Sequence, residues 1–374
     1  MKTNIFHFIG SLNDGGAETL VKDYCLLIDK TTFNSKVITL HNTIDSSNKK
    51  ILESNGIEIL PIYRKWNILT KIFHRVFGSI YVPIKFKRII NKYTPNIIHT
   101  HLRLLHHVHH AVKNKTNIKL FYTCHNLPNK FFGNKDNKEY FACKSLITTH
   151  GLQLIALHDE MKQKLNQMFD VNNTVVIRNA INFKRFTELE ETKNDIRHSL
   201  GIPCDSFVVG HIGRFAEQKN HKFLIDVFYQ LQKTKQNSFL ILVGHGKLEN
   251  EIKEKINLLG LTDKTLILSH RSDIPRLLKS MDVFVFPSIF EGLGIVLIEA
   301  QAMKIRCIVA DTIPLEAFLS ENIVSESLDA PIEKWVYLIA NDKIKNNIYG
   351  DISKYDMNLE MKRLEKLYLG DLND

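Results

Sequence analysis

The sequence predicts an α/β protein of two doubly wound domains, each a parallel sheet covered on both faces by helices. The chain has 374 residues, more than one hydrophobic core usually supports, so two domains are expected. Short apolar runs alternate with longer amphipathic ones in both halves, a pattern typical of βαβ units. The composition, 44% hydrophobic and 24% charged without a repeat, fits an ordinary globular protein and argues against disorder or a repeat array.

The apolar runs form two series separated by a polar, charged passage at 182–205, which leads into a helix ending near Gly201. We therefore expect a first domain at 1–187 and a second at 188–356, with ligands at the carboxyl ends of the strands. The expected strands are Ile5–Ile9, Lys36–Leu40, Ile57–Leu60, Ile97–Thr100, Lys119–Thr123, Leu152–Ala156 and Thr174–Ile177, then Phe207–His211, Phe239–Val243, Leu266–Leu268, Val283–Phe286 and Cys307–Val309.

Targeting and cysteine signals indicate a cytoplasmic protein. No apolar stretch approaches the roughly 18 residues of a membrane-spanning helix. The N-terminal apolar run is too short for a signal peptide and is interpreted as the first strand. The five cysteines are scattered without a Cys-x-x-Cys pair, which predicts reduced thiols and no disulfide or zinc framework.

The charge is unevenly distributed, with a balance of +15 over residues 1–187 and −5 over 188–374. No Asp or Glu occurs from Ile59 to Lys135. Within that stretch, residues 64–92 mix eight Lys and Arg with aromatic and aliphatic side chains, a composition that suits an anionic membrane surface. Two alternatives stay open: a solvated basic face over an ordinary core helix, and a nucleic-acid surface, although no nucleic-acid motif accompanies the charge.

The segment 286–300 carries the strongest chemical signal. Glu291 and Glu299 bracket a turn containing Gly292 and Gly294, between an apolar strand and helical spacing that begins at Ile295. Free amides at a helix N-terminus can bind an anion or sugar hydroxyls, and glycine lets a ligand approach the backbone closely. The alternative is a capping carboxylate followed by a solvated helix residue.

Two further loops follow predicted first strands. In the second half, Gly213 frees a turn from which Arg214 and Lys219 can place two cations over a diphosphate. In the first half, Gly15 and Gly16 precede a helix, but Gly-x-Gly-x-x-Gly is missing, so a dehydrogenase is disfavoured. Ordinary turn glycines and solvated surface cations remain the alternatives.

Histidines gather in the first half. His125 follows a predicted strand and is expected to face the ligand, while His99 and His101 end the preceding strand. Histidines also recur at 106, 107, 109 and 110, but no carboxylate lies nearby in sequence, so surface polar groups are favoured over a metal site.

Taken together, these motifs resemble the retaining glycosyltransferases of family 4, which have the GT-B architecture of two Rossmann-like domains facing a cleft. The resemblance covers nearly the whole chain and implies that a C-terminal helix, about 357–374, crosses back to the first, acceptor-binding domain. It implies that Glu291 and the amides of Gly292, Leu293, Gly294 and Ile295 contact the donor sugar and that Glu299 binds the ribose. It further assigns the diphosphate to Gly213, Arg214 and Lys219, the base to Arg271, and donor contacts to His125, Gly15 and Gly16.

The function implied by the resemblance is transfer of a hexosyl unit from a nucleotide sugar, most simply a UDP-sugar, to a hydroxyl of a saccharide acceptor. His125, Arg214, Lys219 and Glu291 are the expected catalytic residues, with no metal and no other cofactor. The acceptor is expected to be lipid-linked, at the inner membrane face in surface polysaccharide biosynthesis. A UDP-sugar 2-epimerase of the same fold and a non-enzymatic polyanion-binding protein are the alternatives, and the donor sugar is not specified.

Overall fold

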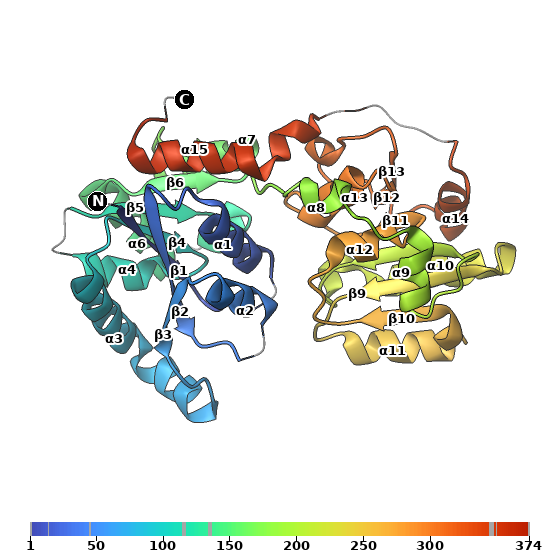
Figure 1. Cartoon of the computed structure of the whole chain (residues 1–374), viewed down its shortest axis with the longest axis horizontal. Helices are drawn as coiled ribbons and strands as arrows, with labels where there is room; N and C mark the ends of the chain where they lie inside the picture. Colours follow the sequence, from blue (N-terminus) through green and yellow to red (C-terminus); the bar gives the residue numbers. More distant parts are fainter. Residues whose placement is uncertain are drawn as a thin grey trace. The chain divides into compact units, whose positions relative to one another are not determined.

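The computed structural model describes residues 2–13, 15–44, 46–113, 117–133, 137–343, 348 and 350–372. It divides the chain into two compact units (Figure 1). The first unit comprises residues up to Asn179 together with those from Asn358 onward, and the second is Ala180–Met357. Each unit contains one parallel sheet with its own hydrophobic core.

The first unit is built on a seven-stranded sheet in the order β3-β2-β1-β4-β5-β6-β7, in which every pair is parallel. Because helical crossovers cover both faces, its central strands are buried runs. The strands are β1 Thr3–Ile9, β2 Phe33–His41, β3 Glu58–Tyr63, β4 Ile97–His101, β5 Lys119–Thr123, β6 Gln153–Ala156 and β7 Val175–Val176.

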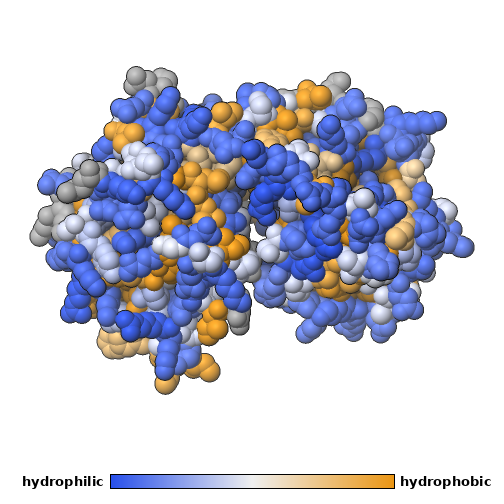
Figure 2. Space-filling model, in the orientation of Figure 1, coloured by the Kyte–Doolittle hydropathy of each residue, from blue (hydrophilic) through white to orange (hydrophobic). Residues whose placement is uncertain are grey.

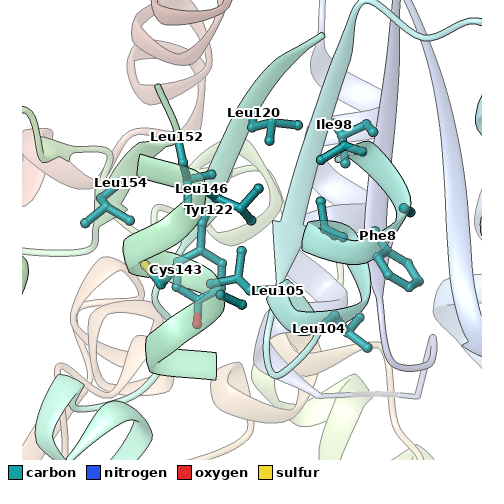
Figure 3. Packing of buried hydrophobic residues seen from close by; sticks show 14 of the residues in the cluster. Phe8, Ile98, Leu104, Leu105, Leu120, Tyr122, Cys143, Leu146, Leu152 and Leu154 are labelled. Atoms are coloured by element: carbon teal, nitrogen blue, oxygen red, sulfur yellow. The ribbon is translucent and has the colours of Figure 1, made fainter. Parts of the chain in front are cut away.

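Successive side chains of β1 point to opposite faces of the sheet, and each face has its own hydrophobic core. Phe6 and Phe8 enter a large cluster with residues from α3, α4, α6 and α7, and Figure 3 shows part of that packing around Phe8 and Tyr122. Ile9 joins a second cluster with α1 and α2 on the opposite face. The helices are α1 Gly16–Leu27, α2 Ser47–Ser54, α3 Ile68–Tyr93, α4 Leu105–Val112, α5 Pro128–Phe132, α6 Lys138–His150, α7 Asp159–Phe169 and α15 Met357–Leu369.

The second unit contains a six-stranded parallel sheet in the order β10-β9-β8-β11-β12-β13, and its faces are again separate cores. Its strands are β8 Phe207–Ile212, β9 Ser238–Val243, β10 Thr265–Leu268, β11 Val283–Phe286, β12 Arg306–Ala310 and β13 Ile323–Glu326. Its helices are α8 Lys184–Thr187, α9 Lys193–Ser199, α10 His221–Thr234, α11 Glu249–Leu258, α12 Ile274–Lys279, α13 Ile295–Ala302 and α14 Ile332–Ala340, with 3-10 turns η1 Glu217–Lys219, η2 Thr262–Lys264, η3 Leu315–Ala317 and η4 Ile352–Tyr355.

The fold class is confirmed, and all twelve expected strands are present. One further strand, β13, was not expected, because it is short and ends in polar Ser325 and Glu326. The two compact units divide at Asn179/Ala180, eight residues before the expected boundary at 187/188. The segment 180–187 groups with the second unit because the Ile181 amide donates to the Tyr355 carbonyl at 2.8 Å and Phe186 packs in that unit's core.

The C-terminal helix α15 belongs to the first unit, as expected. Its Tyr368 hydroxyl lies 2.6 Å from Nδ1 of His99 on β4, and the Glu360 carboxylate accepts from the Arg178 amide at 2.6 Å. The Glu365 carboxylate accepts from the amide of Asp29, which follows α1, at 2.7 Å. Among the helices that the structure describes, none combines the length and hydrophobicity needed to cross a membrane.

Candidate functional site

Two neighbouring strands of the second sheet carry most of the residues predicted to bind the donor. β8 leads into the turn that ends at Lys219, and β11 leads into the loop that contains Glu291. The strands pair in parallel, so both loops leave the same edge of the sheet. The loops are also bonded to each other: the Ile289 amide donates to the Gln218 carbonyl at 2.8 Å, and the Gln218 side chain donates to the Phe290 carbonyl at 3.0 Å.

Lys219 and Glu291 form an ion pair at this edge. Lys219 Nζ lies 2.7 Å from Glu291 Oε1 and 4.5 Å from the centre of the Phe286 ring. The two side chains are only 15% and 7% exposed, so removing one partner would leave a poorly solvated charge. The cation can bind phosphate oxygens and the carboxylate can accept from sugar hydroxyls, the two kinds of group that a nucleotide sugar presents.

Glycines shape the backbone beside this pair. Gly294, immediately before α13, has φ 74°, and a Cβ there would lie 3.0 Å from the Phe286 ring. A Cβ on Gly213 would lie 2.9 Å from His211 Nε2 and 3.1 Å from Cδ of Lys219, so glycine leaves room for the path of the lysine. The Leu297 amide of α13 donates to the Gly294 carbonyl at 2.8 Å, whereas the amides of Ile295 and Val296 precede the first intrahelical bond and can donate to an anion.

Three other predicted residues of the second unit are Arg214, Glu299 and Arg271. Arg214 follows β8 directly, is exposed, and forms no ion pair with any residue that the structure describes. Glu299 lies half-buried on α13. Arg271 donates to both carboxylate oxygens of Asp273, at 2.7 and 2.5 Å, and this bonding raises the pKa of Arg271. Asp273 stands at the N-cap position of α12, but its side chain makes no capping hydrogen bond because its carboxylate accepts from Arg271.

In the first unit, His125 lies just beyond β5 at the carboxyl edge of the sheet, half-buried. Its Nε2 is 3.0 Å from Nδ1 of His101, whose Nε2 is 3.4 Å from Nδ1 of His7. Burial lowers the pKa of His125 to about 4 and that of His7 to about 3. These imidazoles are therefore neutral near pH 7 and act there as hydrogen-bonding groups.

Ring nitrogens of the buried His7, His99 and His101 lie within 4.8 Å of one another, close enough to share a metal ion. His99 is already engaged through both nitrogens, with the Tyr368 hydroxyl at 2.6 Å and the Thr123 hydroxyl at 2.7 Å. The arrangement is that of a hydrogen-bonded core that joins β1, β4 and β5 to α15.

The histidines of α4 differ from their expected surface role. His107 is buried, and the ring of His106 contacts the carboxylate of Glu139 on α6, so a carboxylate distant in sequence does lie nearby. Gly15 caps α1 and Gly16 begins it, as the loop motif predicts. A Cβ on Gly15 would lie 2.4 Å from Oε2 of Glu18, so that side chain occupies the space next to the glycine.

Comparison with known proteins decides the family. The sequence model described as Glycosyltransferase Family 4 matches residues 14–185, and that described as Glycosyl transferases group 1 matches residues 192–324. Together the two models cover most of the chain, one for each domain. This chain belongs to the family 4 glycosyltransferases.

Individual relatives agree. The putative glycosyltransferase EpsF of Bacillus subtilis is 26% identical over 90% of this chain and 86% of its own length. An Escherichia coli protein named UDP-Gal:alpha-D-GlcNAc-diphosphoundecaprenol alpha-1,3-galactosyltransferase is 33% identical over 46% of this chain and 45% of its own length. The crystal structure of Anabaena HepE in complex with UDP and glucose has a TM-score of 0.77 at 19% identity, covering 99% of this chain and all of that one. The fold of this glycosyltransferase is GT-B.

Three further residues at the candidate site were not expected from the sequence. Gln218 ties the two loops together, and His211 and His221 lie buried behind them with ring centres 4.6 Å apart. Among the described residues, His211 Nε2 and both nitrogens of His221 have no hydrogen-bond partner, and burial lowers the pKa of both rings. The signal was the short segment from His211 to His221, which carries two histidines besides the cations.

Proposed function

We propose that the chain is a retaining glycosyltransferase that moves a hexosyl unit from a UDP-sugar to a hydroxyl of a saccharide acceptor. The observation that carries the proposal is the Lys219–Glu291 pair at 2.7 Å, held by two bonded loops at the carboxyl edge of a parallel sheet. It places a phosphate-binding cation beside a carboxylate suited to sugar hydroxyls, with the α13 amides next to them. The complex of HepE with UDP and glucose supports the same class of donor.

The proposed chemistry follows from where charge develops. Breaking the anomeric C–O bond leaves positive character on the sugar and an additional negative charge on the departing diphosphate. Lys219 and Arg214 would stabilise that diphosphate together with loop amides near the start of α13, and such stabilisation is usually a large catalytic contribution. The acceptor hydroxyl would attack from the face that the diphosphate leaves, giving its proton to a diphosphate oxygen. Configuration at the anomeric carbon is then retained without a protein nucleophile.

The residues of the first unit take supporting roles in this proposal. Neutral His125 would hydrogen-bond the transferred sugar, and the loop at Gly15 and Gly16 would lie against donor or acceptor. With two cations on the diphosphate, transfer is expected to need no divalent metal and to persist in EDTA.

The acceptor is proposed to be a saccharide on a lipid diphosphate at the inner face of the cell membrane, in surface polysaccharide assembly. The named acceptor of the Escherichia coli relative, a GlcNAc-diphosphoundecaprenol, supports this class. So does the absence of acidic residues from Ile59 to Lys135, of which residues 114–116, 134 and 135 lie outside those that the structure describes.

The test is a screen of UDP-sugars by thermal shift, followed by transfer to a lipid-linked or short-chain acceptor. A stabilising UDP-sugar and an α-linked product from an α-linked donor are expected. Inversion at the anomeric carbon, or a glycosyl-enzyme adduct in intact-mass spectra, would refute the mechanism. Change of the sugar without any acceptor would indicate an epimerase instead.

A further inference from the structure

A concave surface lies along β3, the edge strand of the first sheet, far in sequence from the donor loops. Its volume is about 940 Å³, and its walls come from β3, from α2 and from one face of α3. On α3 the lining residues Tyr81, Lys85, Arg88 and Lys92 recur at spacings of four, three and four, so they share a single helix face. We call this surface the β3 groove.

The β3 groove is strongly cationic. Six Lys or Arg side chains line it, against the single carboxylate of Glu53, which lies 3.7 Å from Lys49. The other five form no ion pair with any described residue; they are Arg64, Lys65, Lys85, Arg88 and Lys92. Glu58 on β3 lies near Lys92 and accepts from the Tyr93 hydroxyl at 2.9 Å, but the cations still outnumber the carboxylates. Cations that converge on a concavity repel one another, and an anion bound among them relieves that repulsion.

The first part of α3 has a different exposed surface. Eight large apolar side chains stand out from it, and several are more than half exposed; they are Ile68, Leu69, Ile72, Phe73, Val76, Phe77, Ile80 and Ile84. Figure 2 shows hydrophobic atoms at the end of the first unit where Figure 1 places this part of α3. Such a patch on a soluble surface usually marks a site of interaction.

The apolar patch and the β3 groove border each other residue by residue. Ile80 is exposed while Tyr81 lines the groove, and Ile84 is exposed while Lys85 lines it. A ligand that fills both must therefore join an anion to hydrocarbon within a few ångströms. Nucleic acids offer phosphates without hydrocarbon, whereas a membrane lipid presents both at the bilayer interface.

We propose that the β3 groove binds the phosphate of an anionic phospholipid while the apolar patch of α3 enters the acyl boundary. Phospholipid is favoured over the diphosphate of the acceptor because of distance within the sheet. Four strand spacings of about 4.8 Å separate β3 from β5, which leads to His125, so the groove lies roughly 19 Å along the sheet from that histidine. The proposal deepens the membrane association in the proposed function and rests on it.

The first experiment uses the full chain and dihexanoyl-phosphatidylglycerol, a lipid that stays monomeric at low concentration, by titration calorimetry. The groove variant is K85S/R88S, and the matched control is K71S/R75S, which removes two cations from α3 outside the groove. Binding to the unaltered protein, its loss in K85S/R88S and its persistence in K71S/R75S are expected. No binding of the monomeric lipid, or equal loss in both variants, would overturn the site.

The second experiment measures sedimentation with vesicles. On phosphatidylcholine vesicles containing phosphatidylglycerol, K85S/R88S should bind about 25-fold more weakly, as expected for two cations near the surface. A second control, K233S/K264S, removes two cations from the second unit and should change binding less than about 2-fold. The substitution I72S/V76S should also weaken binding, because it removes exposed apolar surface.

Two outcomes of the vesicle experiment would show that the β3 groove binds a different ligand. If K85S/R88S weakens binding only to neutral vesicles carrying undecaprenyl diphosphate, the groove serves the acceptor and the phospholipid assignment is wrong. If an oligonucleotide displaces the anionic vesicles through the same residues, a lipid site is likewise wrong. Thermal shift by UDP should be unchanged in every variant, and its absence from the unaltered protein would count against the donor proposal while leaving the groove result intact.

Discussion

The carboxyl edges of the two sheets carry opposite kinds of polar group. In the second unit, Lys219 and Glu291 are ionised side chains paired at 2.7 Å in bonded loops. In the first, His7, His101 and His125 form a chain of imidazoles that burial keeps neutral. The comparison teaches that one sheet holds ionised groups, which the proposed leaving diphosphate would need, while the other holds uncharged groups that hydrogen-bond within its core.

The largest expected effect tests the charged edge. Lys219→Ala should lower kcat by about 100- to 1000-fold, because it removes a cation from the proposed diphosphate site and leaves Glu291 unpaired. The measurement is steady-state transfer with the best UDP-sugar. Lys222→Ala is the control: this nearby lysine pairs with exposed Glu251 and should keep nearly full activity. Equal activity in the two variants would remove Lys219 from the mechanism.

The next effect is a loss of stability at low pH, caused by protonation of the buried histidines of the first unit. The imidazole of His7 has a pKa near 6.5 when unfolded and about 3 when folded, so the unfolded state binds more protons between these values. The contribution of neutral His7 to the free energy of unfolding is fully present above pH 6.5. It is lost as the pH falls, and the loss reaches about 3 kcal/mol at pH 4.

Chemical denaturation at several pH values, following the first unit, measures this loss. His7→Gln should flatten the dependence on pH, whereas His198→Gln, at an exposed position, should preserve it. A stability that stays level from pH 7 to 4 would show that the histidines are not buried as neutral groups.

A smaller effect concerns the link between the neutral edge and α15. Tyr368→Phe removes the hydroxyl 2.6 Å from His99 and leaves a buried nitrogen without that partner, which should cost about 1–3 kcal/mol of unfolding free energy. Urea unfolding measures it. Tyr337→Phe, at a position 59% exposed, should change stability by less than about 0.5 kcal/mol, and a similar loss in both would argue against the link.

The smallest expected effect is on transfer activity, and it compares the neutral His125 with the charged Lys219. His125→Ala should lower activity by about 10-fold, the worth of one hydrogen bond to a sugar hydroxyl, with little change in thermal shift by UDP alone. His198→Ala serves as control. A loss as large as that of Lys219→Ala would mean that the first unit contributes more than a neutral contact.

Much of this arrangement could be predicted from sequence because it depends on local signals. The apolar run Val283–Phe286 predicts β11 with the bounds that the structure shows, and helical spacing from Ile295 predicts the start of α13. Those two elements determine where Glu291 lies. The boundary near residue 180 could not be placed, since it depends on the bond from the Ile181 amide to Tyr355, 174 positions later.

Other features could not be predicted from the sequence, because they too depend on contacts between distant residues. The contact of His106 with Glu139 and the position of Tyr368 on His99 join residues distant in sequence. The basic composition of residues 64–92 indicated an anionic partner, but only the packing of α3 along β3 separates a cationic concavity from an apolar surface. Composition reports which groups are present, and tertiary structure determines which of them converge.

In sequence, the second unit is inserted into the first. Its two ends are hydrogen-bonded to each other, because the Met357 amide donates to the Ile181 carbonyl at 3.0 Å. A premature stop codon just after residue 357 would therefore leave the second unit complete. The first unit would be damaged instead, because it would lose α15 and the contacts of Tyr368, Glu360 and Glu365. The same topology makes 180–357 a natural excisable fragment, whose paired termini would also suit circular permutation.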